Sequence, residues 1–294
     1  FAKDNLFRVT ILKFGDHHTK VIWTFHHILM DGWCMSIMIN DFATYYEELT
    51  EGVGRSVIEQ RIEQELLGVS TYGDYVKWLR KQDRTRGLEY FKNLLSDYTE
   101  IANIKPSKMK EGQAVSKTYQ LPFSKKVTEI VTKKAKQWSV TVNSLMECAW
   151  GILLQKYNRT DDVVFGKVVS GRNVDLPGIE RMIGLFINTI PVRVQLSEKV
   201  KFQELVRQTQ EQATQSDEYS YCSLAEIQAQ TSIGRELIQT LFVFENYYVE
   251  ENKAKDTKMK FVFENGTEAT NYDLTLTILC KDVLECNMMY DASL

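Results

Sequence analysis

Two adjacent histidines, His26 and His27, are the residues of this 294-residue chain whose types and spacing best fit acid–base chemistry. Asp31 and Gly32 follow them closely, in the run Phe-His-His-Ile-Leu-Met-Asp-Gly-Trp. Imidazole has the side-chain pKa nearest to neutral pH, so it can take up and return a proton there. A glycine beside such a group lets a substrate approach the backbone. The pattern therefore predicts a catalytic site at residues 26–33.

Residue type alone leaves three interpretations of the histidine pair open. A metal site needs more ligands, and the four histidines and five cysteines of the chain form no matching cluster, so no metal is expected. A purely structural pair is the second interpretation. In the third, alternation along a strand sends the two rings to opposite faces, one to the core and one to a cleft. That division suits one working imidazole and one supporting imidazole.

The aspartate of the motif also has alternative roles. Asp31 pairs with an arginine to hold the loop, orients an imidazole as the third member of a triad, or simply forms a turn with Gly32. Its distance of four residues from His27 favours the arginine. No Gly-x-Ser-x-Gly elbow, phosphate loop or Gly-x-Gly-x-x-Gly fingerprint occurs in the chain. A covalent serine or cysteine intermediate and the use of ATP or NAD are therefore not expected.

A second anchor is the apolar run from Met182 to Arg193. Asn188 is the polar residue within it, and a buried amide must donate its N–H₂ group either to a substrate carbonyl or to the backbone. We expect a buried strand here, entered through a turn at Gly184.

Composition indicates an ordinary globular protein. Hydrophobic residues make up 44% and charged residues 26%, and the net charge of −3 suggests no nucleic-acid partner. No apolar stretch has the length of a membrane helix. The scattered cysteines argue against a disulfide framework and favour the cytoplasm.

Hydrophobic periodicity predicts the elements that must hold the two anchors. We expect strands at 6–14, 20–25 (mostly buried), 117–121, 162–170, 187–194, 241–245, 260–264, 272–280 and 283–290. We expect helices at 34–49, 72–98 with a break near Arg86-Gly87, 125–137, 141–157, 201–215 and 223–230. The histidine loop then lies before a helix, whose free N–H groups and dipole favour developing negative charge. The fold class is mixed α/β.

The two anchors together resemble those of the condensation domains of non-ribosomal peptide synthetases. The His-His-x-x-x-Asp-Gly motif of that family is complete at residues 26–32, and its Ile-Gly-x-Phe-x-Asn-Thr motif is complete at residues 183–189. Weaker matches follow the family order: Tyr72-Gly73-Asp74-Tyr75 with Trp78, residues 161–172, and Phe242–Asn246. The early arginine motif of the family is absent, and the match around residues 216–220 is poor.

The resemblance implies a chloramphenicol acetyltransferase-like fold, with two lobes in a V around a central tunnel. We accordingly expect residues 1–100 to be the later part of the N-terminal lobe, residues 101–116 a linker, and residues 117–294 the C-terminal lobe. The chain would then be a condensation domain truncated at its N-terminus.

The resemblance also implies an activity: formation of an amide bond between a donor acyl thioester and the amine of an acceptor aminoacyl thioester. His27 would be the working imidazole, His26 its support and Asp31 the residue that holds the loop; Gly32, Trp33 and Asn188 would bind substrate. No cofactor is bound directly, because the substrates arrive on the 4'-phosphopantetheine of carrier proteins. The partners would be an upstream donor and a downstream acceptor peptidyl carrier protein and an adjacent adenylation domain. The alternatives are a non-catalytic recruitment domain and a CoA-dependent acyltransferase.

Overall fold

A computed structural model describes residues 5–16, 18–104, 116–197, 199–245 and 270–292. The described chain forms two compact units. Of the described residues, the first contains those up to Arg80 together with Val174–Ile187, and the second contains Lys81–Asn173 and those from Asn188 onward. Among the described residues, no helix combines the length and the apolar character needed to span a membrane.

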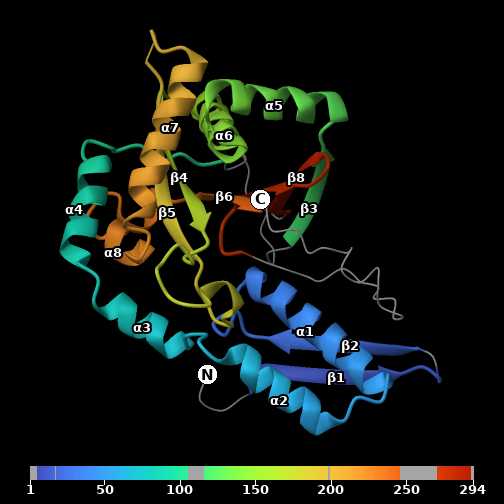
Figure 1. The fold of residues 1–294 in the computed structure, drawn as a ribbon. Coiled ribbons are helices and arrows are strands. Elements are labelled where there is room, and N and C mark those ends of the chain that lie inside the picture. Colours follow the sequence, from blue (N-terminus) through green and yellow to red (C-terminus); the bar gives the residue numbers. More distant parts are fainter. Residues whose placement is uncertain (1–4, 17, 105–115, 198, 246–269, 293–294) are drawn as a thin grey trace. The chain divides into compact units, whose positions relative to one another are not determined.

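The first unit consists of a β-hairpin and helices that follow it in sequence (Figure 1). Its elements are β1 (Phe7–Lys13), β2 (Thr19–Phe25), α1 (Gly32–Thr50), α2 (Arg55–Leu66), α3 (Tyr72–Arg80) and the short helix η1 (Ile179–Arg181). The strands predicted at 6–14 and 20–25 and the helix predicted at 34–49 are confirmed.

The expectation that β2 is mostly buried is wrong. β1 and β2 pair only with each other among the described residues, antiparallel from Phe7↔Phe25 to Lys13↔Thr19. Trp23 packs edge-on against Phe42 of α1, with ring centroids 5.8 Å apart. No residue of β2 is fully buried, and Ile22 and Leu12, which point to the face opposite Trp23, are exposed. A strand with only one covered face can cover only every second side chain.

Helix α2 is an element that hydrophobic periodicity did not predict. Its sequence is mostly charged and polar, and it contains two ion pairs between residues four apart: Arg55 with Glu59 (2.8 Å) and Arg61 with Glu65 (3.4 Å). Arg61 also forms a two-pronged ion pair with Glu48 of α1. Pairs at i,i+4 support a helix without an apolar stripe, so the apolar pattern there was weak.

The second unit is built on a six-stranded mixed sheet. Its strands are β3 (Ser116–Pro122), β4 (Asp162–Val169), β5 (Asn188–Gln195), β6 (Thr240–Glu245), β7 (Leu274–Cys280) and β8 (Leu284–Asp291), in the order β3-β8-β7-β6-β4-β5. β4–β6 and β6–β7 are parallel, and the other pairs are antiparallel. Its helices are α4 (Arg84–Leu94), α5 (Lys125–Trp138), α6 (Val142–Asn158), α7 (Phe202–Asp217), α8 (Leu224–Gln228) and the short η2 (Gly234–Leu237). These elements confirm the predicted ones, apart from the strand expected at 260–264, which lies outside the described residues.

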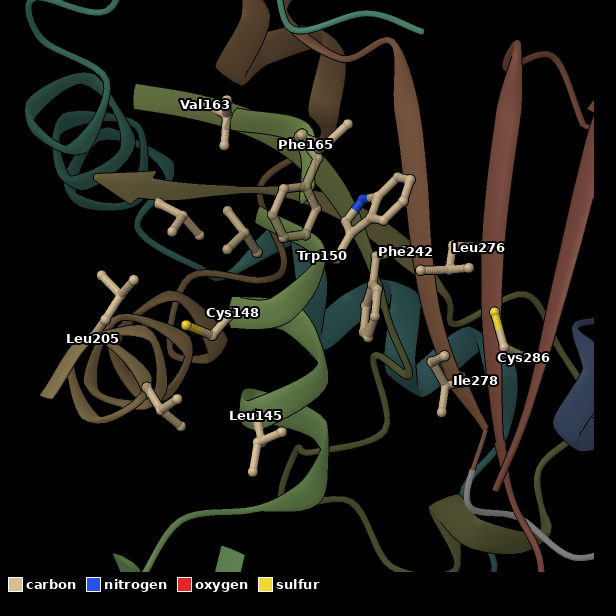
Figure 2. Close-up of a cluster of buried hydrophobic side chains, with 14 of the residues drawn as sticks. Leu145, Cys148, Trp150, Val163, Phe165, Leu205, Phe242, Leu276, Ile278 and Cys286 are labelled. Atoms are coloured by element: carbon tan, nitrogen blue, oxygen red, sulfur yellow. The ribbon is translucent and has the colours of Figure 1, made fainter. Parts of the chain in front are cut away.

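The largest core of this unit lies between the sheet and helices α6 and α7 (Figure 2). Trp150 of α6 lies beside Phe165 of β4, Cys148 of α6 points toward Leu205 of α7, and Phe242, Leu276, Ile278 and Cys286 extend the cluster across the sheet. Thr141 caps α6 by accepting the N–H of Ser144 at 3.0 Å, which confirms the predicted cap.

The helix predicted at 72–98 does break, but at residues 81–83 and not at Arg86-Gly87. Asp83 is the N-cap of α4 and accepts the N–H of Arg86 at 3.2 Å. Gly87 is buried inside α4, where a side chain would collide with the Sγ atom of Cys222. The glycine therefore serves close packing and does not interrupt the helix.

Alanine at Gly87 should lower the free energy of unfolding by about 1–3 kcal/mol, because its Cβ atom has no room beside Cys222. Alanine at Gly73 of α3 is the matched control: its Cβ meets only Thr71, at an ordinary 3.4 Å, and better helix propensity should leave stability equal or higher. Urea unfolding of both variants measures this. Equal stability of the two would contradict the close approach.

The division into units differs from the predicted lobes. The change of unit comes at Arg80, because α4 and the residues to Tyr98 pack in the second unit with Val164, Ile190 and Cys222. Of the linker predicted at 101–116, residues 105–115 lie outside the described residues. The assignment of residues 1–100 and 117–294 to two lobes stays a prediction.

Candidate functional site

The two histidines lie in the turn that follows β2, and both are exposed. The expectation that strand alternation would bury one ring is wrong, because the strand ends at Phe25. The N–H of His26 still donates to the carbonyl of Leu6 (2.8 Å), and the N–H of Leu29 donates to the carbonyl of His26 (3.0 Å). These bonds fix the start of the loop and close its turn.

The ring of His26 is tied to its own loop. Its Nδ1 atom accepts the N–H of Ile28 at 3.1 Å. A nitrogen that accepts a hydrogen bond carries no proton, so the other nitrogen of this ring holds the hydrogen in the neutral form. This arrangement gives His26 a fixed orientation, whereas the side chain of His27 is exposed to solvent.

Asp31 fixes the far end of the loop to the second anchor. Its side chain is 1% exposed, and its Oδ2 atom accepts the N–H of Phe186 at 3.0 Å. Its own N–H donates to the carbonyl of Gly184 at 3.3 Å. Asp31 is also the N-cap residue of α1, but its carboxylate makes no cap bond and reaches across the chain instead. Pairing with an arginine stays a prediction that these contacts do not test.

The thiol of Cys34 lies between the same two segments, and the sequence analysis gave it no role. Its Sγ atom is 3.3 Å from Oδ1 of Asp31 and 3.3 Å from the carbonyl oxygen of Gly184. The signal that could have found it is its position three residues after Asp31, on the same face of the first helical turn.

Tyr72 explains why the second anchor contains a glycine. The ring of Tyr72 occupies the space where a side chain on Gly184 would stand, and its hydroxyl donates to the carbonyl of Leu185 at 2.8 Å. Tyr72 and Tyr75 both pack on the buried ring of Phe186, with centroids 5.3 and 4.6 Å away. Burial raises the pKa of Tyr72, so the hydroxyl stays protonated and keeps donating.

Asp74, in the same tyrosine segment, organises the start of α3. Its Oδ2 atom accepts both the N–H (3.0 Å) and the hydroxyl (2.7 Å) of Thr71, and its Oδ1 atom pairs with Lys77 at 2.9 Å. These bonds hold the pKa of Asp74 well below its usual range. The Tyr-x-Asp-Tyr pattern thus combines a helix start with the aromatic support of the second anchor.

Replacing Gly184 with alanine should destabilise the first unit by about 1–3 kcal/mol, because the new methyl group overlaps the ring of Tyr72. Pairing it with Tyr72→Leu should recover part of that loss, since the smaller side chain vacates the space. A double-mutant cycle by thermal unfolding measures the coupling. Purely additive losses would contradict the overlap.

Trp33 and Gly32, predicted to bind substrate, begin helix α1. The indole N–H of Trp33 donates to the carbonyl of Glu180 at 2.9 Å, so this ring ties α1 to η1. Gly32 is exposed. The N–H of Cys34 donates to the carbonyl of Asp31 (3.1 Å), so it is already used within the turn.

Asn188 belongs to the second unit and donates to the backbone, one of the two possibilities that its amide allowed. Its Nδ2 atom donates to the carbonyls of Ser220 and Cys222, both at 2.7 Å, and its Oδ1 atom accepts the N–H of Thr189 at 2.9 Å. Both amide hydrogens are thereby used. Direct substrate binding by Asn188 stays a prediction that requires one of these bonds to open.

Arg193, at the end of the second anchor, is a buried structural residue. Its guanidinium donates to the carboxylate of Asp162 from Nε (3.0 Å) and from a terminal nitrogen (2.6 Å). The other terminal nitrogen donates to Asp97 and to the carbonyl of Leu94, both at 2.9 Å. This fork joins the β4–β5 pair to the end of α4.

Comparison with known proteins identifies the family. The family model described as the condensation domain matches residues 1–294. Bacitracin synthase 3 of Bacillus licheniformis is 36% identical over 294 residues, which are 99% of this chain and 4% of that protein. The chain belongs to the condensation-domain family of the non-ribosomal peptide synthetases.

Solved structures agree with the fold. The X-domain from teicoplanin biosynthesis matches 99% of this chain and 68% of its own, with a TM-score of 0.73 and 21% identity. The first condensation domain of the CDA synthetase matches 97% of this chain and 62% of its own, with a TM-score of 0.72 and 16% identity. The chain thus spans about two thirds of these structures and a small part of the synthetase. The mixed α/β class is confirmed.

Proposed function

We propose that this chain forms an amide bond between a donor acyl or peptidyl thioester and the amine of an acceptor aminoacyl thioester, both held on phosphopantetheine carriers. The observation that carries the proposal is the exposed His27 imidazole, on a loop whose two ends are fixed by β2 and by the buried Asp31. A loop that is fixed at both ends and presents an imidazole to solvent is suited to positioning and deprotonating an amine.

The reaction needs one proton transfer at the attacking nitrogen. The acceptor amine attacks the thioester carbonyl, a C–N bond forms, and the C–S bond then breaks to release the thiolate of the donor carrier. His27 accepts the proton that the amine loses and can return it to the departing sulfur. An α-amine has a pKa of about 7.7–8.0, so much of it is already neutral, and positioning contributes more than strong basicity. His26 supports the turn through its bond from Ile28.

We also propose the shape of the complete domain and the partners that would bring the substrates to it. The complete domain would have two lobes in a V with a tunnel between them, and Gly32 would leave room for a pantetheine arm. A donor carrier protein, an acceptor carrier protein and an adenylation domain would be the partners, consistent with a likeness to a four-domain nonribosomal peptide synthetase (TM-score 0.73).

A second candidate is a non-catalytic recruitment domain. It is favoured by the likeness to the teicoplanin X-domain, which has been solved in complex with OxyB. The intact pair of His26 and His27 favours catalysis instead, since a binding surface has no need of an exposed acid–base group.

Mixing the full-length protein with one donor-loaded and one acceptor-loaded carrier tests the proposal, with dipeptidyl thioester followed by mass spectrometry. We expect product with carrier-bound donors and little with the same acyl groups on CoA. A preference for CoA would favour a small-molecule acyltransferase. Absence of product with any donor, together with tight binding of a partner enzyme, would favour the recruitment domain.

A further inference from the structure

Cys34 differs from the other buried cysteines in what surrounds it. It is 0% exposed, as are Cys148 and Cys222. Those two and Cys286 belong to hydrophobic clusters, whereas Cys34 belongs to none of the clusters found in the described residues. Its neighbours are instead the Asp31 carboxylate and the backbone of residues 182–184. A thiol in such a place makes polar contacts and does more than fill space.

The directions of these hydrogen bonds follow from the single hydrogen of the thiol. The Sγ atom accepts the N–H of Gly184 at 3.4 Å, so a lone pair of the sulfur, and not the thiol hydrogen, points toward that N–H. Its own hydrogen has the carboxylate of Asp31 and the carbonyl of Gly184 within 3.3 Å, and the charged oxygen is the stronger acceptor. Gly184 N–H, the Cys34 thiol and the Asp31 carboxylate therefore form a short chain of hydrogen bonds between the two motifs.

A nucleophilic role for this thiol does not fit the site. Burial raises the pKa of Cys34, and the side chain is closed to solvent, so it stays protonated and out of reach of a substrate. The protonated form is the one that can donate to Asp31. Burial thus favours the hydrogen-bonding role.

We propose that Cys34 is a positioning residue for the condensation reaction, which joins Asp31 to the backbone of Gly184 and so fixes the loop that carries His27. This inference rests on the proposed function. Without the thiol, the buried N–H of Gly184 loses its acceptor and Asp31 loses a donor, which loosens the contact between the anchors. The loop would keep its attachment at β2 and lose stiffness at its other end, four residues from His27.

Two substitutions at Cys34 and one matched control test the proposal in the full-length protein. Cys34→Ala removes the bonds, Cys34→Ser restores a donor and acceptor, and Cys148→Ala truncates a cysteine of equal burial inside the apolar core. The readouts are turnover with loaded carriers, the NMR signals of the His26 and His27 rings, and the thermal midpoint.

We expect Cys34→Ala to lower turnover by about 10–100-fold, the cost of an ångström-scale misplacement, and to change the position and width of the NMR signals of the His27 ring. Cys34→Ser should retain most of both properties, and Cys148→Ala should lower only the thermal midpoint. Unchanged signals of the His27 ring in Cys34→Ala, or the same change in Cys148→Ala, would overturn the positioning role. If the unmodified protein makes no dipeptide, the proposed function fails, while the ring signals still decide whether Cys34 positions the loop.

Discussion

Replacing His27 with alanine should lower the rate of dipeptidyl thioester formation by about 10²–10⁴-fold, the usual contribution of a positioned acid–base group. The ring is exposed and lies in a turn, so its removal leaves no cavity and should leave the thermal midpoint unchanged. Single-turnover assays with preloaded carriers measure the rate of the chemical step directly.

Two other histidines calibrate that experiment. His18 is exposed beside Phe14 at the far end of the β1–β2 hairpin, and alanine there should leave the rate unchanged. Alanine at His26 should also lower the rate, because it removes the acceptor for the Ile28 N–H. The loss should be smaller than at His27, because the His26 ring supports the turn and is not the proposed proton acceptor. Asparagine at His26 can supply an oxygen in nearly the same place and should recover part of the rate. Equal rates for the unmodified protein and His27→Ala would end the proposal for this imidazole.

The largest effect on stability should come from Lys167→Met, at about 3–5 kcal/mol. Lys167 of β4 lies 2.7 Å from Glu147 of α6, and the two side chains are 9% and 0% exposed. Removing the lysine leaves a buried carboxylate without its counter-charge. The double variant Glu147→Gln/Lys167→Met should regain most of the loss, since two neutral groups need no ion pair. Urea unfolding of the unmodified protein and of both variants measures these losses.

The pH dependence of that loss has a definite sign. Burial raises the pKa of Glu147 above its ordinary value, and Lys167 opposes the rise. A carboxyl group with a raised folded pKa contributes stability below its unfolded pKa, and that contribution is lost as the pH climbs through the folded value. Lys167→Met should therefore be more destabilised at pH 8 than at pH 5.

A surface ion pair of the same unit is the control for both measurements. Lys281 and Glu285 lie 3.1 Å apart with side chains 45% and 36% exposed. Methionine at Lys281 should change stability by about 0–1 kcal/mol. A loss at Lys167 no larger than this would mean that the buried pair contributes little.

Local periodicity predicted most elements of this fold because their apolar stripes are strong. Helices α6 and α7 and the β7–β8 hairpin each bury several residues, and their bounds were predicted within a few residues. Helix α2 was missed because ion pairs along its surface support it. Gly87 was misread because a glycine that allows close packing looks, in sequence, like one that ends a helix.

The candidate site was predictable in its residue types and not in its contacts. The His-His-x-x-x-Asp-Gly motif located the loop, but strand alternation could not place its rings, because the strand ends one residue before them. The bonds from Asp31 to Phe186 and from Cys34 to Gly184 join residues about 150 positions apart. Only the folded backbone brings such residues together, so no spacing rule within one motif could reveal them.

Because Cys34 is buried, the rate at which its thiol reacts with a modifying reagent reports how often the region of the histidine loop opens. It is the one cysteine of the chain whose residue falls in the first unit, and it is closed to reagents in the folded state. Timed exposure to a thiol-modifying reagent, followed by mass analysis of the fragment around residue 34, would report how often this region opens. The time course would give the opening frequency without any engineered label.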